Sequence, residues 1–124
     1  MPGRTGVDAY TDSMRRDVAD LCDELVKNLG ATVVASITGM RRTTPYRWAS
    51  RTATPGAETE TRLRLTYRVW RMLADAEGKS VALAWFVGSN PRLGEVTPVT
   101  AIREQRDADV IGAALAFIRD VPSA

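Results

Sequence analysis

Residues 85–98, WFVGSNPRLGEVTP, predict the end of one helix, a fixed turn and the start of the next helix. An apolar helical run closes on Val87, and we expect Gly88 to supply the positive φ that favours a helix C-terminus. Asn90-Pro91 stops the helix, because a proline ring disfavours helical geometry at the residue before it. The stretch therefore predicts a rigid corner between two helices.

The second half of this corner predicts how the next helix begins. Leu93 is an apolar anchor that we expect to pack back onto the helices, and Gly94 permits a second tight turn. Thr97 is a favourable N-cap, and Pro98 follows at the first helical position, where its missing N–H costs nothing. An ordinary connection between two helices is the alternative, since Gly, Asn and Pro mark many loops.

The same corner carries a family resemblance. A tryptophan, a short gap, the pattern N-P-x-L-G and a T-P pair that opens a helix resemble the MbcA/ParS-like toxin-binding domain of Xre-type antitoxins. The matching residues are Trp85, Asn90, Pro91, Leu93, Gly94, Thr97 and Pro98. The family often has a second glycine and a basic residue after L-G, where this chain has Glu95 and Val96, so the charge of this surface stays open.

Composition limits the kinds of protein to consider. The chain has 124 residues, of which 44% are hydrophobic, enough for one domain or two very small ones. It contains one cysteine and no histidine, and so lacks an internal disulfide, the commonest general base and the commonest metal ligand. We therefore expect a cytoplasmic protein that is not an enzyme and has no cofactor, no metal and no membrane span.

The net charge of +2 is unevenly distributed. Residues 31–74 hold eight arginines and two glutamates, whereas residues 1–30 hold four basic and six acidic side chains, and residues 75–124 five and seven. A basic centre between acidic ends indicates a nucleic-acid contact confined to one subregion. A solvated arginine-rich face without a partner is the alternative.

Residues 31–50, ATVVASITGMRRTTPYRWAS, predict a helix-turn-helix. Two short helices joined through a turn at Gly39 leave the second helix free to enter a DNA major groove. The side chains of this region that are able to contact bases or phosphates are Arg41, Arg42, Thr43, Thr44, Tyr46, Arg47 and Arg51.

This region is similar to the helix-turn-helix of Xre-type antitoxins, in which a tryptophan often closes the second helix, as Trp48 does here. Pro45 departs from the family, which normally has an aliphatic residue there. With Thr44 as N-cap and Pro45 at the first helical position, the helix would be short and span residues 45–51. Two alternatives stay open: the region reads DNA bases, or it is a helix-turn-helix that serves only as a scaffold.

Hydrophobic periodicity predicts the remaining helices. After a loose start over residues 1–9, a first helix capped by Thr11 or Asp12 would end at Gly30, with Cys22 on its buried face. Three further helices are expected over 57–76, 79–87 and 97–103. A last helix, starting at Asp107 or Asp109, would bury Val110, Ile111, Ala114, Leu115 and Ile118.

We therefore expect an all-α fold, with a helix-turn-helix region over 1–76 packed with a toxin-binding region over 77–124. The resemblance, which covers the chain from about residue 20, implies an antitoxin that binds its operator DNA and blocks the active site of a RES-domain, NAD-consuming toxin. Its implied toxin contacts are Trp85, Asn90, Pro91, Arg92, Leu93, Gly94, Thr97 and Pro98. The tail, which matches no motif, adds Asp120, Val121, Pro122, Ser123 and Ala124.

Two further expectations concern partners. Acidic side chains of the C-terminal region would complement a cationic NAD pocket in the toxin; they are Glu95, Asp107, Asp109 and Asp120. A homodimer is expected, because helix-turn-helix proteins usually read paired half-sites. The alternative function is a solitary helix-turn-helix regulator or adaptor without a toxin partner.

Overall fold

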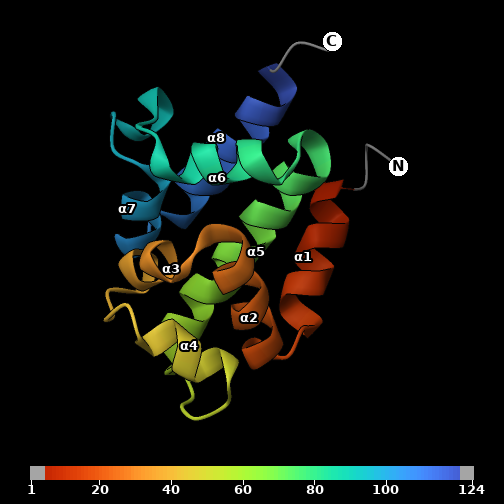
Figure 1. Cartoon of the computed structure of the whole chain (residues 1–124). Helices are drawn as coiled ribbons and strands as arrows, with labels where there is room; N and C mark the ends of the chain where they lie inside the picture. The colour runs from red at the N-terminus through yellow and green to blue at the C-terminus, as the bar shows by residue number, and fades with distance from the viewer. Residues whose placement is uncertain (1–4, 121–124) are drawn as a thin grey trace.

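The computed structural model describes residues 5–120 as eight α-helices and one short 3-10 helix (Figure 1). These are α1 (Thr5–Arg15), α2 (Val18–Leu29), α3 (Ala31–Thr38), α4 (Thr44–Ala49), α5 (Ala57–Glu77), α6 (Lys79–Val87), η2 (Pro91–Leu93), α7 (Pro98–Arg103) and α8 (Asp107–Asp120). Over this range there is no strand, so the expected all-α fold is confirmed. None of the described helices combines the length and apolar character needed to cross a bilayer.

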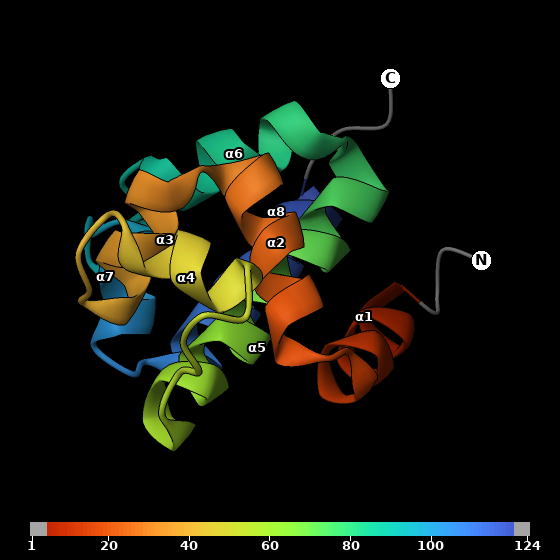
Figure 2. The ribbon, with the colours of Figure 1, turned by 60° about the horizontal axis from the view of Figure 1, so that its bottom comes forward.

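The long helix α5 is the element on which the others pack. It contacts α1, α2, α3, α6, α7 and α8, and Figures 1 and 2 show it running through the middle of the molecule. Leu63, Tyr67 and Leu73 are fully buried along it, and Trp70 almost so. A single hydrophobic core draws side chains from both sides of residue 76, so the two expected regions share one core.

The N-terminal part differs from the sequence expectation in two ways. Residues 5–9 are helical rather than loose, and the expected single helix ending at Gly30 is divided into α1 and α2. The division occurs at Asp17, whose extended backbone ends the helical path and whose carboxylate accepts a hydrogen bond from the Asp20 N–H at 3.4 Å. This aspartate, rather than Thr11 or Asp12, caps α2.

Two expectations about the C-terminal half are also wrong. Gly88 has a φ of −88° rather than a positive φ, because the chain leaves α6 in an extended conformation. A Cβ at this position would lie 3.3 Å from the Ala84 carbonyl oxygen, so glycine is favoured by this close approach and not by a positive φ. Leu115 is 47% exposed, because α8 turns Val110, Ala113 and Ala114 toward its neighbours and leaves Leu115 on the other side.

Helix α1 is attached to α5 largely by polar contacts. The Asp12 carboxylate accepts hydrogen bonds from the Tyr67 hydroxyl at 2.7 Å and from Arg71 at 2.6 Å. Arg64 donates to the main-chain carbonyls of Ser13 at 2.9 Å and Arg16 at 2.7 Å, near the end of α1. Through these contacts the guanidinium groups of Arg64 and Arg71 on α5 hold α1 in place.

The ionised form of Asp12 is favoured at this junction. Burial alone would raise the pKa of Asp12, but the hydrogen bond from Tyr67 and the charges of Arg16 and Arg71 outweigh burial and hold the pKa below its ordinary value of 3.8. A lowered pKa in the folded state means that ionised Asp12 stabilises the fold above the unfolded-state pKa.

We predict that Asp12→Ala lowers the free energy of unfolding by about 2 kcal/mol, because it removes the acceptor of the Tyr67 hydroxyl and one of the two carboxylates that bind Arg71. Urea denaturation at neutral pH measures this. The difference from wild type should start to shrink as the pH falls below about 4, where Asp12 of the unfolded chain binds a proton, and should keep shrinking down to the lower pKa of the folded state. Glu104→Ala is the control, since Glu104 is an exposed acidic residue outside this junction; an equal loss there would contradict the assignment.

Candidate functional site

The region expected to contact DNA is built from α3, the turn after it and α4. Gly39 ends α3 in the left-handed conformation with a φ of 74°, as the sequence predicts for this turn. Helix α4 packs against α2 and α3, and it buries Pro45 and Trp48 on its inner side. The opposite side of α4, with Tyr46 56% exposed, is open to solvent.

Helix α4 begins and ends earlier than expected. Thr44 is already helical and Thr43 occupies the N-cap position without a side-chain cap, so the expectation of Thr44 as N-cap is wrong by one residue. The Thr44 N–H bonds to the Arg41 carbonyl at 3.0 Å, which starts the helical path one residue earlier. Pro45 therefore lies in the first turn, where proline is tolerated, and the helix spans only six residues.

Most of the expected DNA-contact residues share one surface. Arg41, Arg42, Thr43, Tyr46 and Arg47 are exposed, and Thr44 is partly exposed. Within residues 5–120, none of these three arginines forms an ion pair. We call Arg41 and Arg42 of the turn before α4, together with Arg47 on the exposed side of α4, the arginine turn.

Arg51 stands apart from this surface. It follows α4 with a φ of 67°, and its guanidinium pairs with Asp17 at 2.8 Å and Asp20 at 3.2 Å, at the start of α2. These carboxylates raise the pKa of Arg51, the hydrogen bond to Asp17 being the largest cause. The charge of Arg51 is therefore already engaged within the protein, a pairing across 31 and 34 residues that local sequence does not reveal.

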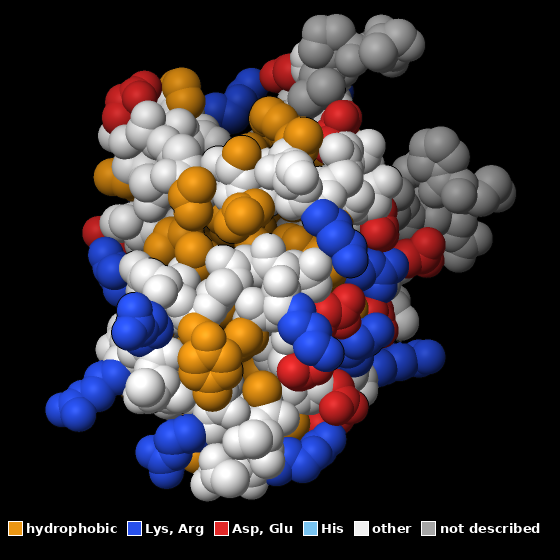
Figure 3. All heavy atoms as spheres, in the orientation of Figure 1, with side chains coloured by type: hydrophobic (Ala, Val, Ile, Leu, Met, Phe, Trp, Pro, Cys, Tyr) orange, Lys and Arg blue, Asp and Glu red, His pale blue; other side chains and the backbone are white. Residues whose placement is uncertain are grey.

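The other arginines of the basic centre are also engaged. Arg62 and Arg64 pair with Glu58 and Glu60 at 3.1 and 3.0 Å. Arg71 pairs with Asp12 and Asp75, and the Arg68 guanidinium lies 4.9 Å above the Tyr10 ring. In Figure 3, blue and red side chains are interleaved on the right, beside α1, whereas at the lower left blue side chains stand apart from red ones.

The corner between α6 and α7 is closed by Asn90. Its main-chain carbonyl accepts hydrogen bonds from the N–H groups of Leu93 and Glu95, both at 2.9 Å, and its side-chain oxygen accepts from the Arg92 N–H at 2.9 Å. The Asn90 N–H donates to the Val96 carbonyl at 3.0 Å. Four hydrogen bonds around one residue give this turn a defined shape.

Three details predicted for the corner are confirmed. Gly94 has a φ of 71°, Leu93 is only 1% exposed, and the Thr97 hydroxyl caps α7 by accepting a hydrogen bond from the Thr100 N–H at 3.1 Å. Arg106 also donates to the Leu93 carbonyl at 3.1 Å, which joins the corner to the start of α8.

The expected toxin contacts are divided between the interior and the surface. Trp85, Leu93 and Pro98 are buried, and Trp85 packs edge-to-face on Phe86 with ring centroids 5.3 Å apart. At the surface, Pro91, Arg92, Gly94 and Asp120 are exposed, and Asn90 and Thr97 are partly exposed. Tail residues Val121, Pro122, Ser123 and Ala124 lie outside the described residues.

A hollow of about 260 Å³ lies between the corner and α8, and we call it the corner groove. It is lined by Asn90, Pro91, Arg92, Ala113, Phe117 and Asp120. Arg92 and Asp120 approach to 3.6 Å, one from each side. Sequence reasoning missed Ala113 and Phe117, although their spacing of four residues places them on one face of a helix.

The acidic side chains of the C-terminal region do not form one negative surface. Asp109 pairs with Arg106 at 3.1 Å and Asp120 with Arg92, while Asp107 lies at a different hollow. Glu95 is exposed at the corner itself. Complementarity to a cationic pocket therefore rests on fewer free carboxylates than the sequence indicates.

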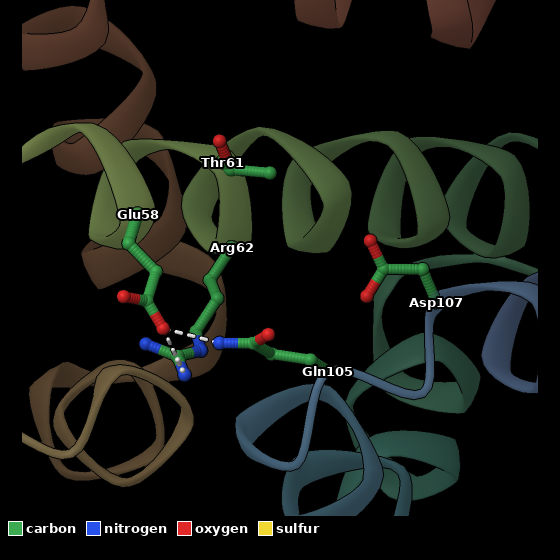
Figure 4. A pocket seen from close by; sticks show the side chains of 5 residues that line it. All are labelled: Glu58, Thr61, Arg62, Gln105 and Asp107. Atoms are coloured by element: carbon green, nitrogen blue, oxygen red, sulfur yellow. Dashed lines mark hydrogen bonds and ion pairs between the residues drawn. The ribbon is translucent and has the colours of Figure 1, made fainter.

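That second hollow, of about 200 Å³, joins the start of α5 to the connection after α7. Figure 4 shows Glu58, Arg62 and Gln105 pointing toward one another, with Asp107 on the other side. The Glu58 carboxylate accepts hydrogen bonds from both Arg62 and Gln105. These contacts fasten the α7–α8 connection to α5, which is a structural role.

The single cysteine of the chain lies within residues 5–120, which the structure describes. Cys22 is fully buried, and burial raises the pKa of its thiol to about 12, so it remains a protonated core side chain. No group of three or more His, Cys, Asp or Glu residues there is arranged to hold a metal ion.

Neither a protein-family model, nor a curated protein, nor a solved structure matches this chain. Two surfaces then carry the chemistry from which a function can be inferred, the arginine turn and the corner groove.

We predict opposite effects from the same substitution at two exposed glycines. Gly94→Ala should destabilise the protein by about 1 kcal/mol, because alanine is strained at positive φ. Gly112→Ala, in the interior of α8, should stabilise it by about 0.5–1 kcal/mol. An added Cβ meets no atom within 4 Å at either position, so thermal unfolding compares backbone effects alone. Equal shifts in Tm would refute the rigid-corner geometry.

Proposed function

We propose that this protein is an antitoxin with two separate binding surfaces. The arginine turn would bind operator DNA, and the corner groove would bind a RES-domain, NAD-consuming toxin. The observation that carries the proposal is the distribution of positive charge: five arginines of the basic centre form ion pairs or a cation–π contact within the protein, and the three that form neither lie at the arginine turn.

Phosphate contacts would supply most of the DNA affinity. The outward side of α4 offers Tyr46 and Arg47, and the preceding turn offers Arg41 and Arg42, all exposed. Lysine and arginine contacts to phosphate release counterions and make binding strongly salt-dependent. Because α4 has only six residues, its base contacts would be few, and we assign the arginine turn mainly a phosphate-binding role.

Toxin binding would depend on the fixed shape of the corner. The buried residues Trp85, Leu93 and Pro98 hold the corner in position, and the exposed Pro91 and Arg92 form one wall of the groove. A turn already closed by its own hydrogen bonds loses little conformational entropy when it docks. Inhibition would be steric, through occlusion of the toxin's active site, with no chemical step.

We predict that replacing Arg41, Arg42 and Arg47 together by Gln removes the salt-dependent part of binding to the protein's own promoter DNA. With three phosphate contacts per subunit, log K for wild type should fall against log salt with a slope of about −2.7 per subunit. Fluorescence anisotropy at several salt concentrations measures the slope. Arg119→Gln, an exposed arginine at the other end of the fold, is the control.

If the triple variant kept the wild-type affinity and slope, the arginine turn would not be the DNA surface. If Arg119→Gln weakened binding equally, the effect would reflect overall charge rather than this surface.

We predict that Arg92→Glu lowers affinity for the co-expressed RES-domain toxin at least ten-fold, because it breaks the pair with Asp120 and reverses the charge of the groove wall. Co-purification, calorimetry and rescue of growth from the toxin measure the effect. Arg42→Glu is the matched control and should keep toxin binding while losing DNA binding. Full protection by Arg92→Glu would remove the groove from the toxin interface.

The alternative function, a solitary regulator or adaptor, shares the DNA surface but needs no toxin. The genes beside this one distinguish the two: a neighbouring RES-domain gene whose product binds the chain supports the antitoxin. Promoter binding without any such toxin would favour the regulator.

A further inference from the structure

The outer face of α1 carries three exposed hydrophobic side chains on a single stripe. Val7, Tyr10 and Met14 are 60, 48 and 57% exposed, and their spacing of three and four residues places them on one side of the helix. Single exposed hydrophobic residues are ordinary on protein surfaces, but a contiguous stripe indicates an interface.

Within residues 5–120 this stripe stays about half exposed, although the Arg68 guanidinium lies 4.9 Å from the centroid of the Tyr10 ring. Helix α1 packs chiefly against α5 through its opposite side, where Ala9 and Ser13 are buried, and Figures 1 and 2 both show α1 at the edge of the molecule. Beside the stripe, a hollow of about 220 Å³ between α1 and α5 is lined by Tyr10, Met14 and Leu65 and by the polar residues Ser13, Thr61, Arg64 and Arg68. The stripe and the apolar part of the hollow together offer a surface that a second helix can fill.

The charges at the two ends of α1 indicate that the helix packing on this surface is α1 of a second copy. Asp8 lies in the first turn and Arg15 in the last, and neither forms an ion pair with another described residue. If two copies of α1 pack antiparallel, Val7 of each copy opposes Met14 of the other, and the Tyr10 rings meet near the axis. Each Asp8 then comes within reach of the other copy's Arg15. A two-fold interface requires such a self-complementary surface.

We infer that α1 is the dimer interface of this protein, formed by antiparallel packing against α1 of a second copy. The expectation of a homodimer from paired DNA half-sites assigned no surface to it, and this inference does not depend on the proposed antitoxin function. The α1 interface leaves the arginine turn free, because α1 and α4 lie in different parts of the molecule (Figure 2).

Sedimentation equilibrium of the full chain tests the interface. Wild type should dimerise reversibly, and Val7→Glu combined with Met14→Glu should raise the dissociation constant at least ten-fold, because it places four carboxylates in an apolar contact. Val87→Glu is the control, since Val87 is 51% exposed on α6 and should leave the dimer unchanged. Circular dichroism checks that each variant keeps its helix content.

A charge exchange tests the antiparallel direction. Asp8→Arg or Arg15→Asp alone should weaken the dimer by placing like charges opposite each other, and the two together should restore it. A wild-type monomer at every concentration, a dimer unaffected by the Val7 and Met14 substitutions, or no restoration by the double exchange would each overturn the inference. If Val7→Glu/Met14→Glu abolished toxin binding but left the dimer intact, the stripe would be a surface for the toxin, and the inferred dimer interface would be wrong.

Discussion

The guanidinium groups of α5 are bound by carboxylates and main-chain carbonyls, and this internal pairing determines which positive charges remain for a partner. Arg71 and Tyr67 share the Asp12 carboxylate, while Arg64 binds two carbonyls at the end of α1. The acidic N-terminal helices therefore neutralise much of the basic centre that the sequence shows. Of the eight arginines in this basic centre, only the three of the arginine turn form neither an ion pair nor a cation–π contact within residues 5–120.

The corner between α6 and α7 is organised differently, by burial and main-chain hydrogen bonds rather than by charge. Leu93 and Trp85 fix it to the core, and Asn90 closes the turn. The two surfaces therefore share one core but differ in chemistry: under the proposed function, one would offer arginine cations to a polyanion and the other a shaped groove to a protein. Such a separation allows substitutions that affect one partner and spare the other.

Local patterns predicted the local features well. Helix 79–87, the left-handed Gly94, the Thr97 cap and the buried Leu93 follow from hydrophobic periodicity and turn chemistry alone. The errors arose where distant residues decide. Arg51 is held by two aspartates of α2, Leu115 is turned outward by the way α8 packs, and Phe117 joins the corner groove only because α8 lies beside η2. Asp12 caps no helix because it lies inside α1, where its carboxylate accepts hydrogen bonds from Tyr67 and Arg71, and Asp17 caps α2 instead.

The proposed DNA surface requires that the arginines of the arginine turn are free to bind phosphate while those of α5 stay in their contacts within the protein. NMR distinguishes these two groups of arginines directly. Promoter DNA can be added to ¹⁵N-labelled protein while the arginine Nε–Hε signals are followed at low and high salt. The account predicts that the signals of Arg41, Arg42 and Arg47 shift on binding and return at high salt, while those of Arg64 and Arg71 stay in place. Equal shifts of the α5 arginines, or none at the arginine turn, would contradict it.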